Sequence, residues 1–436
     1  ASGRVVFGYN QYGRCTDATR TKCTKEPLAA TVTPATPSMY PDIPFDQLCT
    51  GASCTSLVSP TFWTTGMLDT VTTQVLASGK YNPVDVWTLG HSFPDPGDGT
   101  AAALWLTKID HTGYAGASSL AEPTTKFAGV TMQNRVWVLT GFAPLDKYRI
   151  SSITTSLGGI ISVNYSAEEC TPAGAAGIMA APESNTKRCF PQTWIPQVVP
   201  ASAAQKDLFH KYVVTSVISN PSTGGGNDLT QETDYVYTGT PAWRYNTSTF
   251  VPEAQRTWSV YAGYNSVEIR VGDSAKPSTQ QTTAYTFYQG MDGDRADTAG
   301  STRSVSVTGA AGTPDSLWFA GTTRETKVLN GAGGATLSTT VSTPWASNVT
   351  ATDGTVSARM TGEASSLTTN PVSTGGTRTV ETKTSHDSRY GLSTTVETVT
   401  SDAGSTCTTN SYAAANTSAW LVGLPSRVTT VGVGCG

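Results

Sequence analysis

The four histidines are the residues of this chain best suited to acid–base chemistry, and each has a carboxylate close to it in the sequence. The pairs are His91 with Asp95 and Asp98, His111 with Asp110, His210 with Asp207, and His386 with Asp387. A serine hydrolase needs a histidine that is oriented by a carboxylate and lies within reach of a nucleophile. The chain contains neither a GxSxG nucleophile elbow nor an HExxH metal motif. We therefore predict no catalytic residue and expect the histidines to be hydrogen-bonded loop residues.

Two short acidic turns contain aspartates that can act as calcium ligands. The segment PDPGDG contains Asp95 and Asp98, and the segment MDGDR contains Asp292 and Asp294. Calcium prefers such oxygen ligands, but an EF-hand loop needs further ligands and a distal Glu that neither segment supplies. Asp and Gly also favour tight turns without any metal. We therefore expect these four aspartates to form turns and no cofactor to be bound, with calcium at them as the alternative.

Eight cysteines form four pairs that are close in the sequence. The pairs are Cys15 with Cys23, Cys49 with Cys54, Cys170 with Cys189, and Cys407 with Cys435. An even number fits disulfides, although the sequence does not determine the pairing. Zinc is disfavoured because the chain has no CxxC pair and no histidine near a cysteine. Disulfides indicate an oxidising compartment, so we expect an extracellular or cell-surface protein, with a cytosolic protein carrying free thiols as the alternative.

The charge and hydropathy of the chain argue against two kinds of partner. Only 14% of the 436 residues are charged and the net charge is −4. Binding to nucleic-acid phosphates or anionic lipids requires a basic surface, which this composition does not provide. No apolar run approaches the ~20 residues of a membrane helix, and the start, ASGRVVFGYN, lacks a signal-peptide pattern. We expect neither nucleic-acid binding nor membrane insertion, and an exported chain would have lost its signal or be part of a longer protein.

The elements that position these residues are expected to be β-strands. Thr, Ser, Val and Tyr are abundant, and 42 Gly and 24 Pro interrupt the chain, which is typical of short strands and turns rather than long helices. The predicted strands are Val71–Leu76, Val84–Leu89, Arg135–Phe142, Tyr212–Ile218, Asp234–Thr238, Arg256–Tyr261, Ser266–Val271, Thr282–Tyr288, Ser301–Val307, Thr322–Leu329 and Ala335–Val341. The segment GAGG at Gly331–Gly334 predicts a hairpin turn.

The strand pattern changes near a Pro- and Ala-rich stretch at Val198–Lys206. We expect residues 1–200 to form a loop-rich β region with short disulfide-closed loops. Residues 201–436 are expected to form a regular antiparallel strand array, because apolar and polar residues alternate there most clearly. Ten Trp and 17 Tyr can either line a sugar-binding face or pack between strands. Packing is favoured for Trp105, Trp137, Trp258 and Trp318, which lie within or beside strand patterns.

Several sequence blocks, each short, follow one another in an order that resembles large secreted actinobacterial RHS/YD-repeat proteins. The blocks are PDIPFDQLCTGASC, SPTFWTT, HSFPDPGDGTAAALWL, CFPQTW, FHKYVVT, TFYQGMDGDR, SHDSRYG and WLVGLPSRV, and they extend over nearly the whole chain. The resemblance implies a β-sheet that spirals into a hollow shell, with a C-terminal toxin or effector domain often kept inside. It further implies that the partners are the remaining shell and the effector of the same polypeptide.

The chain departs from the complete family pattern near its C-terminus. It has no DPxG-type segment, which self-cleaving members carry in their aspartyl autoprotease, so we expect an upstream shell section and carry over neither self-cleavage nor toxicity. The expected fold is all-β, a rolled antiparallel sheet of the RHS/YD-repeat type with a loop-rich N-terminal part. The expected function is that of a non-enzymatic shell section, with self-association through free sheet edges. An adhesin or glycan-binding β-protein and a secreted hydrolase are the alternatives.

Overall fold

The computed structural model describes residues 2–26, 34, 36–49, 51, 54, 61–196, 203–223, 229–354 and 356–436. Strands make up 48% and helices 7% of the structure, which confirms the all-β prediction. The chain divides into two compact units, Ala1–Gln231 with Tyr245–Ser259 (unit 1) and Glu232–Arg244 with Val260–Gly436 (unit 2). The boundary expected at residue 200 lies outside the described residues.

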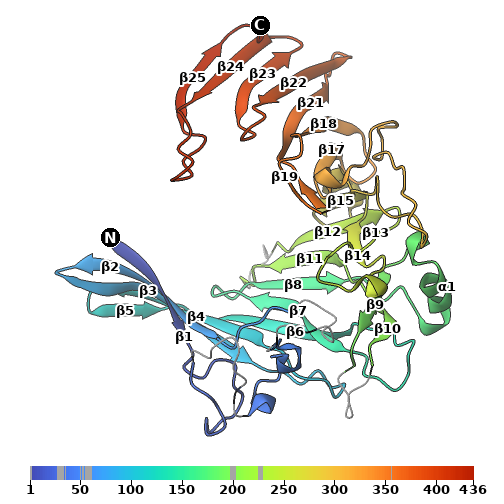
Figure 1. Cartoon of the computed structure of the whole chain (residues 1–436). Coiled ribbons are helices and arrows are strands. Elements are labelled where there is room, and N and C mark those ends of the chain that lie inside the picture. The colour runs from blue at the N-terminus through green and yellow to red at the C-terminus, as the bar shows by residue number, and fades with distance from the viewer. Residues whose placement is uncertain are drawn as a thin grey trace. The chain divides into compact units, whose positions relative to one another are not determined.

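The main sheet of unit 1 is antiparallel throughout (Figure 1). Its strands, in the order in which they pair, are β1 (Gly3–Tyr9), β2 (Leu68–Ala77), β3 (Lys80–Ser92), β4 (Trp105–Ala115), β6 (Thr125–Gln133), β7 (Asp146–Thr154), β8 (Ile160–Tyr165) and β11 (Val214–Asn220). The short strand β5 (Ser118–Ala121) forms a hairpin with β4, and β9 (Cys189–Trp194) and β10 (Gln205–His210) form a separate ribbon.

The main sheet of unit 2 is also antiparallel, and most of its neighbours are consecutive in the chain. Its strands, in pairing order, are β12 (Gln231–Thr238), β15 (Ser266–Val271), β16 (Gln281–Phe287), β17 (Thr323–Asn330), β18 (Thr336–Ala346), β21 (Thr361–Pro371), β22 (Thr377–His386), β23 (Ser393–Thr400), β24 (Gly404–Tyr412) and β25 (Pro425–Val431). Two small ribbons pair β13 (Ala242–Arg244) with β14 (Val260–Gly263) and β19 (Ala351–Asp353) with β20 (Val356–Ala358).

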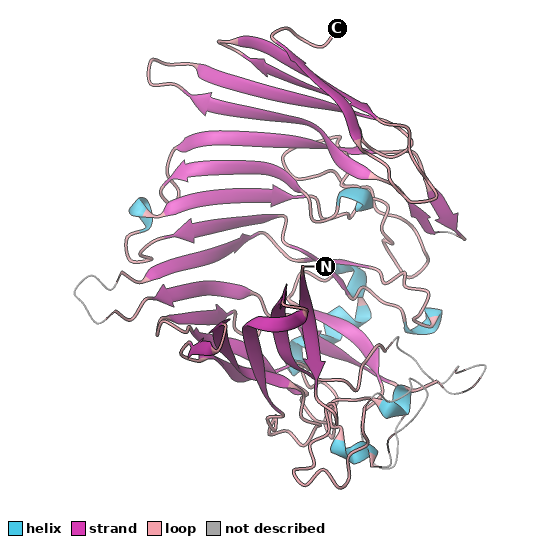
Figure 2. Ribbon diagram, turned by 90° about the vertical axis from the view of Figure 1, so that its left-hand side faces the viewer, coloured by secondary structure: helices cyan, strands magenta, loops and turns pink. Residues whose placement is uncertain are grey.

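In the described part of the chain, helices are confined to short segments in the connections between strands (Figure 2). They are the α-helix α1 (Ala175–Ala180) and the 3₁₀ turns η1 (Pro37–Met39), η2 (Phe45–Gln47), η3 (Pro172–Gly174), η4 (Pro182–Ser184), η5 (Glu253–Gln255), η6 (Pro277–Thr279) and η7 (Leu317–Phe319). Such short turns cannot cover a sheet face with an apolar layer, as the helices of α/β folds do.

Most of the predicted strands are confirmed. The prediction Ser266–Val271 coincides with β15, where Val267, Ile269 and Val271 alternate with Glu268 and Arg270. The predicted hairpin at Gly331–Gly334 joins β17 to β18, and the Asn330 N–H donates to the Ala335 carbonyl across it at 2.9 Å. The alternation of apolar and polar residues and the type of turn residue suffice to predict these elements, because both are local properties of the chain.

Three of the predicted strands were wrong in whole or in part. Arg256–Tyr261 overlaps a strand only at its end, in β14, and Ser301–Val307 forms only isolated bridges. In the latter segment, the Val305 N–H donates to the Asp292 carboxylate and the Arg303 N–H to the Asp294 carbonyl, so a compact loop replaces the ladder. Arg135–Phe142 is also a loop, because the Arg135 guanidinium donates to the carbonyls of Leu139 and Ala143 and curls the chain around itself.

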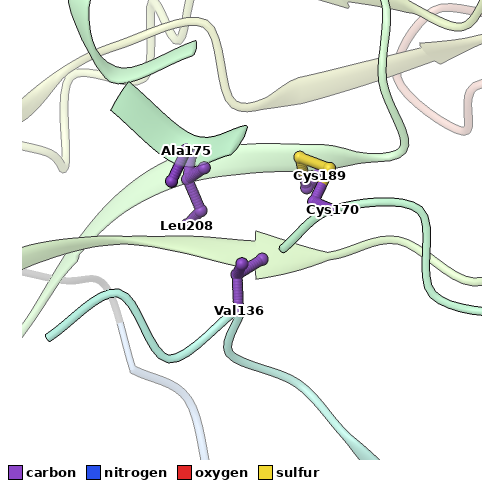
Figure 3. Close-up of a cluster of buried hydrophobic side chains, with 5 residues drawn as sticks. All are labelled: Val136, Cys170, Ala175, Cys189 and Leu208. Atoms are coloured by element: carbon purple, nitrogen blue, oxygen red, sulfur yellow. A yellow bond between two sulfur atoms is a disulfide. The ribbon is translucent and has the colours of Figure 1, made fainter. Parts of the chain in front are cut away.

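Unit 1 has a small apolar cluster at Cys15, Tyr40 and Ile43, and its larger apolar core lies beside the β9–β10 ribbon rather than within the main sheet. It consists of Val136, Cys170, Ala175, Cys189 and Leu208, which Figure 3 shows between α1, the ribbon and the neighbouring loops. The Cys170–Cys189 disulfide passes through this cluster. The structure contains three further disulfides, Cys15–Cys23, Cys49–Cys54 and Cys407–Cys435. Each disulfide therefore joins a cysteine to the next cysteine along the chain.

A fully buried ion pair lies next to this core. Arg135 and Asp207 are both 0% exposed, and the Arg135 Nε lies 3.0 Å from Asp207 Oδ2. The guanidinium also lies over the Trp194 ring, with its carbon 4.6 Å from the ring centroid. A buried charge is tolerated only when its hydrogen bonds and a counter-charge are supplied. The pair therefore fixes the loop of residues 135–143 against β10.

We expect Asp207→Asn to lower the free energy of unfolding of unit 1 by roughly 3–5 kcal/mol, because it leaves the Arg135 charge buried without a counter-ion. Asp402→Asn is the matched control, since the Arg378–Asp402 pair is exposed and such pairs contribute about 1 kcal/mol or less. Urea unfolding followed by tryptophan fluorescence measures both. Equal losses in the two variants would contradict this account of the buried pair.

Removing the core disulfide by the double change Cys170→Ala/Cys189→Ala should cost about 3 kcal/mol, from the loop entropy of a 19-residue separation. The corresponding change at Cys49 and Cys54, separated by five residues, should cost about 2 kcal/mol. Chemical denaturation compares the two double variants. A larger loss for the Cys49 and Cys54 variant would show that loop length is not the governing quantity.

Candidate functional site

The four histidines all lie in strands, so the expectation that they occupy loops was wrong. His91 lies in β3, His111 in β4, His210 in β10 and His386 in β22. Successive side chains of a strand point to opposite faces of the sheet. A carboxylate next to a histidine in the sequence therefore cannot orient that histidine when both belong to one strand.

The carboxylates that neighbour the histidines in the sequence are indeed bound elsewhere. Asp110 binds Lys108 at 2.7 Å and accepts the Thr124 hydroxyl at 2.6 Å, and Asp207 binds Arg135. Asp387 accepts the backbone N–H groups of Arg389, Tyr390 and Leu392 and so caps the turn between β22 and β23. Burial raises the pKa of Asp387, but these hydrogen bonds outweigh burial and the pKa is lowered.

The tightest histidine site of unit 1 is assembled across strands. Asp85 Oδ1 lies 3.0 Å from His111 Nε2, and Glu122 Oε1 lies 3.3 Å from His111 Nδ1. Trp87, which is directly opposite His111 on β3, stacks on the imidazole with a centroid distance of 4.8 Å. The hydrogen bond to Asp85 is the main cause that raises the pKa of His111, and Glu122 adds to it.

This geometry favours the protonated form of His111, which links β4 to Asp85 and Glu122. Both nitrogens of His111 face carboxylates, so neither nitrogen is free to take a proton from a substrate. The carboxylates Asp85 and Glu122 were not predicted from the sequence, because nothing local to His111 indicates which strands pair with β4. The registers of β3 with β4, and of β4 with β5, bring them there.

A second group surrounds His210, whose side chain is only 2% exposed. Burial lowers the pKa of His210, against the opposing charge of Glu168, whose Oε2 lies 3.9 Å from Nε2. Burial likewise raises the pKa of Tyr212, whose hydroxyl donates to the Gln133 carbonyl at 2.8 Å. His210 and Tyr212 are therefore neutral near pH 7. Their environment is that of packed polar groups at the end of the β9–β10 ribbon.

His386 packs against an aromatic ring in unit 2. Its imidazole stacks on Trp345 of β18 with a centroid distance of 4.5 Å, over Gly362 of β21. A Cβ atom at Gly362 would lie 3.0 Å from His386 Nε2, so the absence of a side chain there makes room for the ring. Among the described residues, no histidine hydrogen-bonds with a serine or a cysteine, so the arrangement that a hydrolase triad needs is not assembled there.

Two of the aspartates considered as calcium ligands cap turns, and the other two bind groups of the loop that follows them. Asp95 accepts the Gly97 N–H and Asp98 the Thr100 N–H, both at 2.9 Å. Asp292 accepts the Val305 N–H at 2.9 Å, and Asp294 lies 3.6 Å from the Arg303 Nε. Within the described ranges, no three His, Cys, Asp or Glu side chains gather closely enough to hold a metal ion.

The tryptophans considered for sugar binding have different environments. Trp258 is 2% exposed, and Trp105 packs against Tyr148, which supports the packing interpretation for both. Trp137 is 45% exposed and has a positive φ of 64°, so the prediction of packing was wrong for this residue. Its strand was predicted from alternation, whereas the loop around Arg135 turns the indole outward. The exposed aromatic residues come from several parts of the chain and include Phe7 and Tyr9 of β1, Phe62, Trp137, Phe250 and Trp420.

The most extensive chemical feature of unit 2 is its main sheet, neither face of which is completely buried. Among the described residues, Thr282 and Cys407 are the only buried ones in its strands. One face carries ion pairs between side chains two positions apart, Glu268–Arg270, Glu325–Lys327 and Glu381–Lys383. The other face carries cross-strand hydroxyl pairs, Thr340–Thr368, Thr382–Thr398 and Thr408–Thr430. Apolar side chains such as Val267, Ile269 and Val271 also lie on the sheet, but they are only half-buried.

The chain matches no protein-family model and no curated protein, so its resemblance to RHS/YD-repeat proteins stays a prediction. None of the helices in the described part of the chain is long and apolar enough to cross a membrane.

The carboxylates beside His111 predict a characteristic pH dependence. Because the folded-state pKa is raised, the stability that His111 contributes is fully present below its ordinary pKa of about 6.5 and is lost as pH rises through the raised value. We expect His111→Gln to be more destabilising at about pH 5.5 than at about pH 9. Urea unfolding at both pH values and a proton NMR titration of the ring measure this.

His91→Gln is the control, for which we expect the opposite pH dependence of the loss in stability. Burial lowers the pKa of His91, so its contribution is present above about pH 6.5 and is lost as pH falls through the lowered value. This variant should be more destabilising at high pH. The same pH trend in both variants would mean that the carboxylates do not determine the titration of His111.

Proposed function

We propose that this chain is a non-enzymatic wall section of a secreted protein of the RHS/YD-repeat type, which encloses or presents an effector segment of the same polypeptide. The observation that supports this most directly is the main sheet of unit 2, in whose strands only Thr282 and Cys407 are buried. A sheet in a globular domain buries one face against a core. A sheet with two wet faces is held by its backbone hydrogen bonds and suits a partition between two aqueous spaces.

The charges of this sheet also favour enclosure over tight recognition. Each acidic side chain of the pairs Glu268–Arg270, Glu325–Lys327 and Glu381–Lys383 has a basic neighbour on its own strand. Paired charges cancel each other's field at a distance, so this face has little selective attraction for cargo of one sign. An enclosed segment would then be kept by the wall as a barrier rather than by strong contacts.

β1 of unit 1 and β25 of unit 2 each have one edge that a further strand can use. Within the described chain, β1 pairs only with β2 and β25 pairs only with β24. Both strands carry exposed apolar side chains, Val5 and Phe7 on β1 and Val428 and Val431 on β25. Unpaired N–H and C=O groups at such edges accept a further strand. In the proposed protein that strand belongs to the next wall section.

The four disulfides agree with this proposal. A sheet with little apolar burial gains less from the hydrophobic effect, and cross-links restrict its unfolded state instead. Disulfides persist in oxidising compartments such as the cell exterior.

Protection of the enclosed segment from proteases tests the proposal. The natural full-length polypeptide and its effector segment alone are exposed to the same protease, and we expect the segment to be cleaved at least about tenfold more slowly within the whole protein. Val396→Pro, which breaks the centre of β23, should abolish the protection because Pro removes a ladder hydrogen bond. Val396→Ala is the matched control that keeps the ladder.

Equal cleavage rates for the free segment and for the segment in the whole protein would overturn the proposal. Hydrogen exchange shows whether Val396→Pro loses the β22–β23 pairing. If that pairing is lost and the segment is still protected, the proposal is also overturned. A natural polypeptide without any segment beyond its wall sections would likewise contradict enclosure.

A further inference from the structure

A groove crosses β4, β6 and β7 on one face of the unit 1 sheet. It has a volume of about 450 Å³, which lies within the ~300–1,000 Å³ of small-molecule sites. Small residues leave this space open, because Ala128 lies directly opposite Ser152 where the lining strands β6 and β7 pair. Beside it, Gly90 pairs with Lys108, and a Cβ atom at Gly90 would lie 2.5 Å from Lys108 Cγ. The lysine stem can therefore lie flat across β3.

The groove carries an uncompensated positive charge. Lys108 and Lys126 are direct partners in the pairing of β4 with β6, and like charges in that position destabilise a sheet. Asp110 lies 2.7 Å from Lys108 and compensates that charge. Among the described residues, Lys126 has no ion-pair partner. An anion bound between the two lysines would relieve their repulsion.

Three hydroxyl-bearing residues line the groove together with the lysines, Phe127 and Ala128. The Thr107 hydroxyl donates to the Gly90 carbonyl at 3.0 Å and is occupied. Within the described chain, the hydroxyls of Ser152 and Thr154 have no hydrogen-bond partner, although both line the groove. These hydroxyls can donate to and accept from the hydroxyls of a ligand. A ligand that fits therefore combines an oxyanion with hydroxyl groups.

We propose that this groove binds an acidic saccharide unit, with its carboxylate or sulfate between Lys108 and Lys126 and its hydroxyls on Ser152 and Thr154. The inference stands apart from the wall function, since it concerns one face of unit 1 and a free ligand. Asp110 assists by holding Lys108 in place, because the same carboxylate also accepts the Thr124 hydroxyl at 2.6 Å. Charge-assisted hydrogen bonds from lysine favour the ionised ligand over a neutral sugar.

Calorimetry at low salt with polygalacturonate, dextran sulfate and neutral dextran tests the site on the intact chain. We expect binding of at least one acidic polymer and none of neutral dextran. Binding of polygalacturonate alone assigns a carboxylate and binding of dextran sulfate alone assigns a sulfate. Equal binding of neutral dextran would overturn the role of the lysines, and binding of inorganic phosphate without either acidic polymer would overturn the saccharide assignment.

Two variants locate the binding at the groove. Lys126→Ala should weaken the affinity for the acidic polymer at least about tenfold, since a hydrogen bond to a charged group contributes that much. Ala128→Leu fills the groove without changing the charge and should weaken binding similarly. Lys80→Ala, at an exposed lysine that begins β3, is the matched control and should bind as the unchanged protein does. Unchanged affinity in Lys126→Ala would overturn the proposal, whether or not Ala128→Leu folds.

Discussion

The antiparallel backbone ladder is the constraint on which the rest of this molecule depends. In the main sheet of unit 2, side chains contribute little burial, so the N–H and C=O groups of each strand are satisfied almost entirely by the neighbouring strands. Thr residues suit this arrangement, because a β-branched side chain favours the extended backbone and its hydroxyl can bind another across the ladder. Cohesion is therefore distributed along the sheet and not concentrated in a core.

Clustered apolar burial occurs in unit 1, around Tyr40 and, more extensively, beside the β9–β10 ribbon. There Val136, Leu208 and the Cys170–Cys189 disulfide pack together, and the Arg135–Asp207 pair adjoins them. Unit 1 thus combines a packed core with an exposed sheet, and its groove at Lys108 and Lys126 lies on that sheet. The main sheet of unit 2 leaves both faces at least partly exposed, and one of them carries paired charges. The proposed roles follow this difference, with a defined ligand at the groove of unit 1 and a partition in unit 2.

Strand geometry also explains why the histidines do not form the pairs that their sequence suggests. A carboxylate one residue away lies on the opposite face, as Asp110 does relative to His111. The partners come from other strands or their connections, Asp85 and Glu122 for His111 and Glu168 for His210. Proximity in sequence is thus a poor guide to charge pairing in a sheet, whereas it suits turn caps such as Asp95 and Asp387.

The sequence by itself determined the all-β class, the strands with clean alternation such as Ser266–Val271, and the GAGG hairpin, because these depend on local backbone preferences. Only the tertiary structure decided that Arg135–Phe142 is a loop, since a buried guanidinium there takes the carbonyls that a strand would have used. The tertiary structure also decided which carboxylates surround His111, and it placed Lys108 directly opposite Lys126 on paired strands. Strand register brings together residues distant in the chain, and no local pattern specifies it.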